Sequence, residues 1–589
     1  MNETHFRIFA PYNKSCSLGI KVFGDIEGKT WKVVPMKKGT DGHFTLKADS
    51  AALKLANKTK YEYKFHITPA HRTTTPDSTP LFCTDPEAKE VHKYDGLNSV
   101  ISYSKGKLFI DTFDWGDEGA VPLPQNNEIV IYELPLQWVK RYGAGGTERG
   151  IGKFTDALEK VETHLNDLGI NAIQFLPTSD SPGSYHWGYG SRNYFAPDPD
   201  FGTPTEFKAL IRECHIRGIR VFLDMVMNHS NDCPLEDINY CYNFIDDSHD
   251  ADRQEAYGRP DWGGKLFKFV YKDPDLNIHP GREFHKKNIA HWINEYHIDG
   301  LRVDSVVSVK NWDFIGEVTS EVEKHLGGVK PHLCLGEDLP PRIDLVREGR
   351  LHALWNDNFK YSVRKAILGE ASLHEIEMMV NPIKEGYSDC SQIINYVGSH
   401  DVEGVRNERI MSLLGNVGIF DDEAFKRVKL AFATLFTAVG TPMIFAGDEF
   451  GDVHDLLPKH PEKQIDPVNW VRLEGGRNRD LFDYVKSMVR LRRDKIALQQ
   501  NSCYILHTDF NWGRKIVVFQ RGDGADRVVV VANFSDKCVG GYNIPNWPQQ
   551  GGRWLEWTQK RYPGDDHVRS GHCQEDIYPY EAKVYVVER

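Results

Sequence analysis

The segment Ile298-Asp-Gly-Leu-Arg-Val-Asp-Ser-Val306 places two opposite charges in a run that otherwise has the composition of a buried strand. Successive side chains of a strand point to opposite faces, so Arg302 and Asp304, two positions apart, point the same way. Burying two charges is costly unless they are paired and used. An arginine favours the ionised form of a neighbouring carboxylate, which is the form that acts as a nucleophile. The alternative is an ion pair that only stabilises a strand end.

Three further apolar runs also end in polar or charged residues. They span Arg220–His229, His332–Asp338 and Ile393–Asp401, and helical patterns separate them. In a parallel (β/α)8 barrel all strands open their carboxyl ends on one face, and that face holds the active site. The polar residues at these ends are Asp224, Asn228, His229, Glu337, His400 and Asp401. Four such runs in order predict a barrel enzyme with its site at this face.

The length of 589 residues predicts a multidomain fold, because single cores rarely grow this large. Residues 1–105 contain short β-rich runs split by turn residues, which is typical of a small β-sandwich. Residues 120–495 hold the barrel pattern, interrupted by a polar insert at about 231–284. Residues 500–589 alternate again and predict a C-terminal antiparallel β domain.

Charge and composition argue against several partners. The net charge of −12 disfavours a polyanionic partner such as nucleic acid. No apolar run approaches the roughly 20 residues of a membrane span, so no membrane partner is expected. The first residues, Met1 to Phe6, lack the basic and apolar segments of a secretory signal. Ten scattered cysteines without a CxxC pair predict reduced thiols, and so a cytoplasmic protein, with a mature secreted form as the alternative.

The four strand-end motifs resemble the four signature regions of the α-amylase family of glycoside hydrolases and transglycosidases in order, content and spacing. The resemblance extends from about Asn127 to the C-terminus, and it implies an α-glucan substrate. Residues 1–105 resemble the N-terminal starch- and glycogen-associated module of branching and debranching relatives. The alternative for this module is a packing domain that binds nothing. Its aromatic residues Trp31 and Tyr63 fit either a sugar platform or the core of the sandwich.

Cleaving a glycosidic bond requires an acid for the leaving oxygen and a carboxylate on the opposite side of the anomeric carbon. A separation of about 5–5.5 Å between the carboxyls makes the second a nucleophile and retains configuration. Asp304 and Glu337 end successive strands, which permits this separation. Arg302 keeps Asp304 ionised, whereas Glu337 needs a raised pKa, which the charge of Asp401 favours. The resemblance assigns the same roles: nucleophile Asp304, acid/base Glu337 and transition-state stabiliser Asp401.

The resemblance also implies positions that contact the substrate. They are Tyr189 as the platform under the sugar, Asp224, His229, Arg302, His400 and, where many amylases carry histidine, Trp187. The alternative for the loop aromatics is packing within the protein. No cofactor is required by this chemistry. Calcium is implied at the asparagine that Asn228 matches, near the insert residues Asp246, Asp247, Asp250 and Asp261, but their spacing fits no defined calcium loop, and solvated loop charge is the other interpretation.

The triad leaves the acceptor open, because water and a sugar hydroxyl attack the same covalent intermediate. We expect an α-1,4-glucan hydrolase, with a branching enzyme as the first alternative and a trehalose-releasing or debranching hydrolase as further ones. A metal-dependent barrel hydrolase would show a His-x-His pair on the first strand, and Ile129 to Leu134 contains none. A non-catalytic glucan-binding protein is expected to have lost part of the triad, and this chain keeps all of it.

Overall fold

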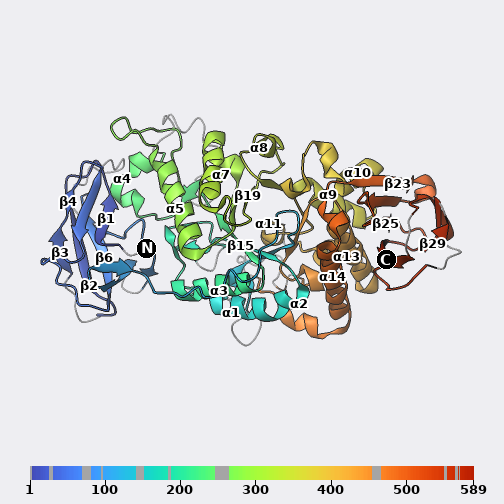
Figure 1. Cartoon of the computed structure of the whole chain (residues 1–589), viewed down its shortest axis with the longest axis horizontal. Coiled ribbons are helices and arrows are strands. Elements are labelled where there is room, and N and C mark those ends of the chain that lie inside the picture. Colours follow the sequence, from blue (N-terminus) through green and yellow to red (C-terminus); the bar gives the residue numbers. More distant parts are fainter. Residues whose placement is uncertain are drawn as a thin grey trace.

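The computed structural model places three parts of the chain in a row, with the N-terminal sheets at one end, a barrel in the middle and the C-terminal sheets at the other end (Figure 1). It describes residues 3–25, 31–68, 81–93, 97–140, 151–183, 187–245, 264–406, 408–453, 455, 466–549, 553–563, 568–569 and 571–588. The insert residues Asp246, Asp247, Asp250 and Asp261 lie outside these ranges.

The N-terminal part consists of two antiparallel sheets around a core of their own. One sheet has the order β10-β9-β6-β2-β3, with β7 beside β6 and β8 beside β9, and the other has the order β1-β5-β4. Tyr63 is buried in the core beside Phe6 and donates to Asp85, so it belongs to the core rather than to an exposed platform. The strands are β1 (His5–Phe9), β2 (Cys16–Val22), β3 (Lys32–Pro35), β4 (Lys37–Lys38), β5 (His43–Lys47), β6 (Thr59–Ile67), β7 (Leu81–Cys83), β8 (Val91–His92), β9 (Asn98–Ser104) and β10 (Lys107–Phe109).

Eight parallel strands close into a barrel in their order along the chain, which confirms the predicted (β/α)8 architecture. Every residue of these strands is buried, because side chains fill the inside of a small barrel and helices cover its outside. The strands are β11 (Ile131–Leu134), β12 (Ala172–Phe175), β15 (Arg220–Met225), β18 (Gly300–Val303), β19 (Leu333–Gly336), β20 (Ala353–Asn356), β21 (Ile393–Tyr396) and β22 (Thr441–Phe445).

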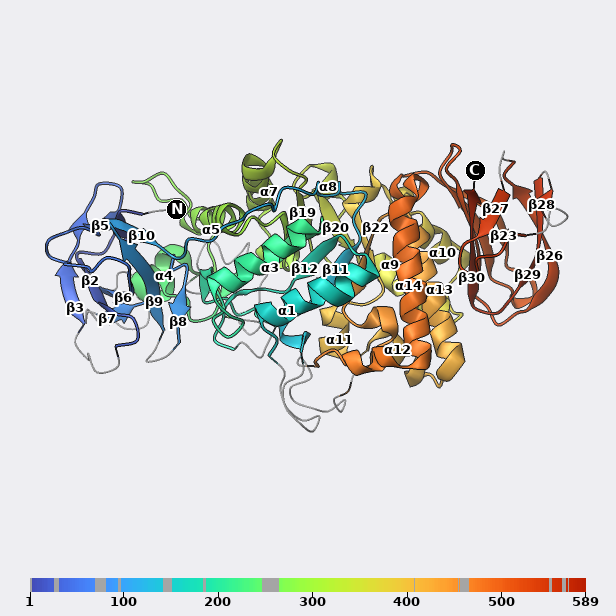
Figure 2. The same cartoon turned by 60° about the horizontal axis from the view of Figure 1, so that its bottom comes forward.

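Helices follow the strands and form the outer layer, as Figure 2 shows for α1 and α3 beside β11 and β12. Thr203 caps α3 by accepting from the backbone of Glu206 at 3.2 Å, and Glu206 accepts in return from the backbone of Thr203 at 2.7 Å. The main barrel helices are α1 (Phe154–Lys160), α2 (Asn166–Leu168), α3 (Pro204–Ile216), α5 (Pro280–Tyr296), α7 (Trp312–Leu326), α8 (Asp344–Arg347), α9 (Asp357–Ile367), α10 (Leu373–Val380), α11 (His400–Arg406), α12 (Ile410–Asn416), α13 (Asp421–Thr437) and α14 (Gly476–Asp494).

The segment between β15 and α5 includes a helix, α4 (Leu235–Asn243), that lies beside the N-terminal sheets (Figure 1). It also contains β16 (His229–Ser230) and β17 (Lys265–Leu266), and it leads into α5. Strand β16 pairs with β17, so His229 leads directly into a short sheet. This segment therefore connects the carboxyl end of β15 with the N-terminal sheets.

The C-terminal part is a second pair of antiparallel sheets that packs on the barrel through α13, which contacts β30. Buried Arg521 of β24 joins the two parts, because its Nη1 donates at 2.6 Å to the carbonyl oxygens of both Thr437 and Ala438. The strands are β23 (Cys503–Asp509), β24 (Ile516–Arg521), β25 (Val528–Asn533), β26 (Val539–Trp547), β27 (Arg553–Glu556), β28 (Val568–Arg569), β29 (Gly571–Ile577) and β30 (Glu581–Glu588). These flanking sheets complete the predicted fold class.

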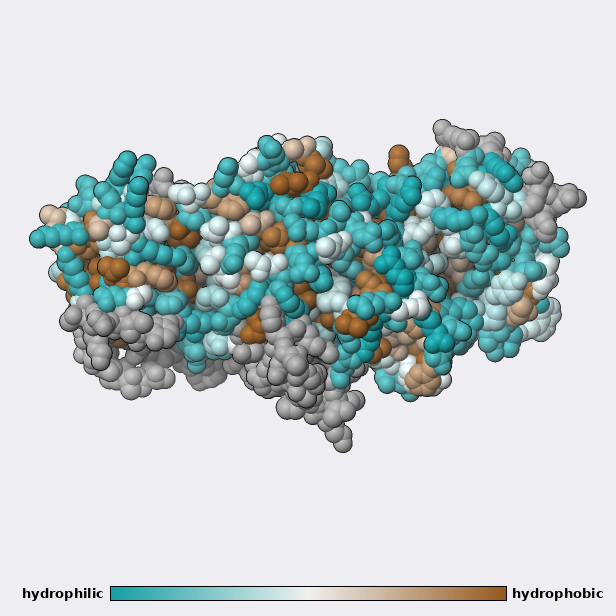
Figure 3. Space-filling view, turned by 90° about the horizontal axis from the view of Figure 1, so that it is seen from below, coloured by the Kyte–Doolittle hydropathy of each residue, from teal (hydrophilic) through white to brown (hydrophobic). Residues whose placement is uncertain are grey.

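Polar residues dominate the face of the molecule drawn in Figure 3, with apolar residues scattered among them. Among the helices that the structure describes, none combines the length and apolar character needed to span a bilayer.

Candidate active site

Arg302 stands at the centre of the site and joins three carboxylates from the ends of three neighbouring strands. Its Nη1 lies 2.6 Å from Oδ2 of Asp224 and 2.8 Å from Oδ1 of Asp304. Its Nη2 lies 2.7 Å from Oε2 of Glu337. These distances are those of charge-assisted hydrogen bonds, which a planar guanidinium can donate in several directions at once. The predicted pairing of Arg302 with Asp304 is therefore present, and it extends to both adjacent strands.

The three carboxylates of the proposed triad are partly exposed, whereas Arg302 and Asp224 beside them are fully buried. The side chains of Arg302 and Asp224 are 0% exposed, whereas those of Asp304 and Glu337 are 14% and 13% exposed. The side chain of Asp401 is 37% exposed. The three carboxylates are thus the groups of this cluster that solvent or a ligand can reach.

Backbone geometry after β18 also contributes to the site. Ser305 adopts a φ of +38°, in the left-handed region that residues other than glycine rarely occupy. In this conformation its backbone N–H donates to Oε2 of Glu337 at 3.0 Å. Such strain costs on the order of 1–3 kcal/mol and is retained where the surrounding structure holds it. Here the strained backbone of Ser305 directs its N–H to the carboxyl group of Glu337. Ser305 directly follows Asp304, so one short stretch of chain carries one carboxylate and binds the other.

The surroundings of Glu337 favour its protonated form. Burial raises the pKa of Glu337 most, Arg302 opposes this, and the charges of Asp401 and Asp304 raise it further, to about 8. A carboxyl group with this pKa carries a proton at neutral pH and can give it to a leaving group. This agrees with the physical cause expected from the sequence, in which the negative charge of Asp401 supports the acid.

Tyr189 and His400 form the wall beside the carboxylates. Their rings are stacked, with centroids 5.5 Å apart, and Nε2 of His400 lies 2.8 Å from Oη of Tyr189. Tyr189 donates to Oδ2 of Asp224 at 2.6 Å, and Nε2 of His229 donates to the backbone oxygen of Tyr189 at 2.8 Å. Burial lowers the pKa of His229, so its ring is neutral at neutral pH. These bonds bring Tyr189, Asp224, His229 and His400 together, as the sequence predicts.

Trp187 lies beside the same wall but presents little surface. Its exposed fraction is 7%, and its ring meets those of His400 and Tyr189 edge to face. On its other side it packs against α11, where a Cβ atom on Gly404 would lie 1.7 Å from Cζ2 of Trp187. These ring contacts are packing within the protein, the alternative considered for this loop aromatic, and a sugar contact of Trp187 stays a prediction.

Two buried residues of this region were missed by the sequence analysis. Glu133, on β11, lies within hydrogen-bonding distance of both Nδ1 and the backbone nitrogen of His400. Trp355, on β20, lies against the guanidinium of Arg302, 4.5 Å from its ring centroid. Glu133 could have been found in the way that Arg302 was, because each is a charged residue within an otherwise apolar strand. The signal for Trp355 is weaker, because tryptophan is common in buried strands.

Asn228 is buried between β15 and β16, and its backbone oxygen accepts from Phe267. Within the described ranges, one group of three side chains has the composition and spacing of a metal site, namely Glu323, His332 and His352. His332 and His352 directly precede β19 and β20, so this group lies at the end of the barrel opposite the carboxylates. Calcium at Asn228 stays a prediction, because the insert carboxylates considered with it lie outside the described residues.

Comparison with known proteins agrees with this geometry. Among curated relatives, the malto-oligosyltrehalose trehalohydrolase of Saccharolobus solfataricus is 24% identical over 83% of this chain and 85% of its own length. The 1,4-α-glucan branching enzyme of Butyrivibrio fibrisolvens is 24% identical over 99% of this chain and 93% of its own length. The crystal structure of a pullulanase from Paenibacillus barengoltzii superposes with a TM-score of 0.75 at 19% identity, covering 99% of this chain and 93% of that chain, and so shares the fold.

The family description "Alpha amylase, catalytic domain" matches residues 140–465, which is more than half of the chain. This range contains Arg302 and the three carboxylates at the ends of β18, β19 and β21. The chain therefore belongs to the α-amylase family of glycoside-processing enzymes.

Proposed function

We propose that the protein is a retaining glycoside hydrolase that cleaves α-1,4-glucosidic bonds in starch, glycogen or maltooligosaccharides. The observation that carries this proposal is the shared guanidinium of Arg302, which binds Asp304 through Nη1 and Glu337 through Nη2. One rigid group thereby sets the spacing of two carboxyls whose surroundings differ. Retaining glycosidases use two carboxyls in this way, one as the acid and one as the nucleophile.

The proposed reaction has two steps. In the first, Glu337 gives its proton to the glycosidic oxygen while a carboxylate oxygen of Asp304 bonds to the anomeric carbon, and the bond to the leaving sugar breaks. In the second, ionised Glu337 takes a proton from water, whose oxygen attacks the anomeric carbon and releases Asp304. Asp401 and His400 bind sugar hydroxyls, and the ring of Tyr189 supports the sugar that reacts.

Transfer to a sugar hydroxyl is the second candidate, because the same intermediate serves both reactions. A branching enzyme and trehalohydrolases stand among the relatives, which supports keeping both transfer and trehalose release as alternatives. Purified protein is incubated with amylose and maltoheptaose, and proton NMR follows reducing ends and α-1,6 linkages together. Reducing ends that rise without new α-1,6 signal support hydrolysis. New α-1,6 signal at nearly constant reducing ends indicates branching, and no change in either signal contradicts both hydrolysis and branching of α-1,4 chains.

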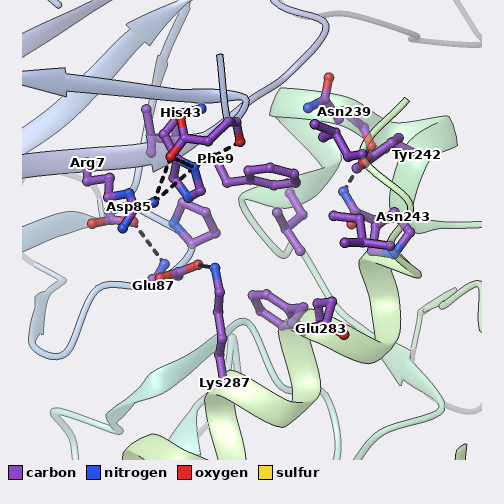
Figure 4. A pocket seen from close by; sticks show the side chains of 18 residues that line it. Arg7, Phe9, His43, Asp85, Glu87, Asn239, Tyr242, Asn243, Glu283 and Lys287 are labelled. Carbon is purple, nitrogen blue, oxygen red and sulfur yellow. Dashed lines mark hydrogen bonds and ion pairs between the residues drawn. The ribbon is translucent and has the colours of Figure 1, made fainter. Parts of the chain in front are cut away.

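The N-terminal module is proposed to bind glucan at its junction with the barrel. A cavity of about 330 Å³ lies there, within the size range of small-molecule sites, which often occur between domains. In Figure 4, Phe9, His43 and Arg7 of the module face Tyr242, Asn243 and Lys287 from the barrel side. Aromatic faces beside amide and charged edges suit a sugar ring, which has apolar faces and a polar rim.

A binding experiment tests this second site separately from catalysis. Isothermal titration of maltoheptaose is carried out on Asp304→Asn, which is expected not to turn the sugar over. We expect two classes of site, and the weaker class to disappear in Asp304→Asn with Phe9→Ala. Val22→Ala, an exposed apolar change elsewhere on the same module, is the control and should leave both classes. A single class of site in all three proteins contradicts a glucan site at the cavity.

A cytoplasmic location is proposed on the state of the thiols. No disulfide joins any of the ten cysteines, as expected of a protein in a reducing compartment. Fractionation of the producing cells, with antibody detection of the protein, tests the location. Recovery of the protein outside the cytoplasm contradicts it.

A further inference from the structure

We propose that Glu133 is a positioning residue that holds His400 as an imidazolium, with its Nε2–H directed to the Tyr189 and Asp401 side of the site. This inference rests on the proposed function, in which His400 binds a sugar hydroxyl. Glu133 lies on β11, the first barrel strand, and 267 positions separate it from His400 in the sequence.

Both oxygens of Glu133 are directed to His400. Oε1 accepts from Nδ1 of His400 at 2.8 Å, and Oε2 accepts from the backbone N–H of His400 at 3.0 Å. Glu133 is fully buried, and Gln174 on the neighbouring strand β12 lies 3.4 Å from Oε1. A buried carboxylate needs compensation of this kind. The arrangement therefore fixes the ring position and places a proton on Nδ1.

The opposite ring nitrogen also faces an acceptor. Oη of Tyr189 has one hydrogen, and it is donated to Oδ2 of Asp224 at 2.6 Å. The contact of 2.8 Å between Oη and Nε2 of His400 is then a bond in which His400 donates. With acceptors at both nitrogens, the hydrogen bonds select the doubly protonated ring.

The charged groups around His400 act in the same direction. Burial opposes the charge on His400, but Asp401 and Glu133 outweigh burial and the repulsion of Arg302, and raise its pKa to about 9. Asp401 contributes from α11 itself, with Oδ1 3.4 Å from Nε2. Asp224, which faces His400 through Tyr189, is held by Arg302. The cation thus lies among acidic groups, and its proton on Nε2 is a charge-assisted donor.

A second buried pair gives a matched control. Oε1 of Glu449 lies 2.6 Å from Nε2 of His164, and its Oε2 accepts from the backbone N–H of Gly447 at 2.9 Å. Glu449, which follows β22, is fully buried like Glu133, and it binds one histidine, one backbone donor and, through Oε1, the hydroxyl of Tyr132 at 2.9 Å. His164 contacts Phe450, Trp470 and Phe482 rather than the carboxylates of the site. Replacing Glu449 therefore removes a comparable buried bond without touching His400.

The test compares Glu133→Gln with Glu449→Gln. A glutamine that accepts from the backbone N–H of His400 turns its amide hydrogens toward Nδ1, which disfavours the proton there. We expect kcat/KM of Glu133→Gln for maltoheptaose to gain a downward step near the ordinary histidine pKa of about 6.5. Above the step the loss is about tenfold, as expected when one charge-assisted donor becomes neutral. The parent and Glu449→Gln should lack the step, even if Glu449→Gln lowers the melting temperature.

Nitrogen NMR of labelled histidine measures the protonation directly in the unaltered protein, and a spectrum of His400→Gln assigns the signal. We expect His400 to be doubly protonated at pH 7.5 in the parent and neutral in Glu133→Gln. A neutral His400 in the parent at that pH overturns the inference, as does a Glu133→Gln profile that matches Glu449→Gln. If the parent neither cleaves nor transfers glucan, the proposed function fails, while the NMR result still decides the state of His400.

Discussion

Nη2 of Arg302 lies 2.7 Å from Oε2 of Glu337, so the guanidinium that holds the proposed nucleophile also holds the proposed acid. Two carboxyls on different strands are thereby fixed relative to one another by one side chain. The barrel strands provide the scaffold, but this side chain sets the spacing on which the chemistry depends.

Replacing Arg302 with lysine should abolish most activity although the charge is kept. An ammonium group is a point charge and cannot reproduce a fork that donates to Asp224, Asp304 and Glu337 together. We expect kcat for maltoheptaose to fall by about 10³-fold or more. The free energy of unfolding should fall by about 1–3 kcal/mol, because buried carboxylate oxygens lose donors. A variant with nearly parental kcat would show that Arg302 does not organise the carboxyls.

The activity should decline on the alkaline side as Glu337 loses its proton. Its raised pKa of about 8 means that the protonated acid predominates at pH 7 and becomes the minor form above pH 8. The pH profile of kcat/KM for maltoheptaose measures this limb directly. An alkaline limb near the ordinary carboxyl value of 4.5 would contradict the assignment of Glu337 as the acid.

The contribution of Glu337 to the free energy of unfolding should decrease as the pH rises, whereas that of a carboxylate with a lowered pKa increases. Because the pKa of Glu337 is raised in the folded state, its favourable contribution is full below about pH 4.5 and is lost as the pH rises toward about 8. Glutamine does not ionise, so Glu337→Gln does not lose stability in this way as the pH rises. The difference in melting temperature, variant minus parent, should therefore increase between pH 5 and pH 8. A constant difference across this range would be inconsistent with the raised pKa.

Gly404→Ala should disturb the wall of the site through Trp187. An added Cβ would lie 1.7 Å from Cζ2 of Trp187, so the indole or α11 must move, and α11 carries His400 and Asp401. We expect kcat/KM to fall by at least about tenfold, as for a misplacement near 1 Å.

Gly316→Ala supplies the control for this change, because a Cβ there meets open space within α7. It should leave activity unchanged and stabilise the protein by about 0.5–1 kcal/mol. Trp187→Leu combined with Gly404→Ala should recover part of the activity, since the smaller side chain makes room. Equal effects of the two alanine changes would argue against the contact.

Much of the architecture follows from local patterns in the sequence. The barrel strands are short, apolar and followed by polar residues, so Arg302, Asp304, Glu337 and Asp401 can be found by their position at strand ends. The capped start of α3 at Thr203 is equally local. Features with distant partners are different. Glu133 is bonded to a residue 267 positions away, and no pattern in β11 names that partner. Tyr63 lies in a run whose side chains alternate between two faces, as in a strand. This alternation does not show whether the face of Tyr63 is the core or a sugar-binding surface.

The segment Phe154 to Leu168, whose apolar spacing is that of a single helix, shows a further limit. The structure interrupts it with a π-helical turn at Val161–Leu165, which contains His164. One extra residue in a turn shifts the apolar spacing too little to be seen in a short window. The bond from His164 to Glu449 is again nonlocal, so neither the turn nor its partner is visible in the sequence.

The most direct measurement of the central claim is the capture of the glycosyl-enzyme. Glu337→Gln is incubated with a fluorinated maltosyl fluoride, whose fluoride leaves without an acid and whose intermediate is hydrolysed slowly. We predict an adduct of one fluorinated maltosyl group by intact mass, located on Asp304 after peptic digestion, and no adduct with Asp304→Asn. An adduct on a different residue, or turnover in which the first product has inverted configuration, would contradict the account.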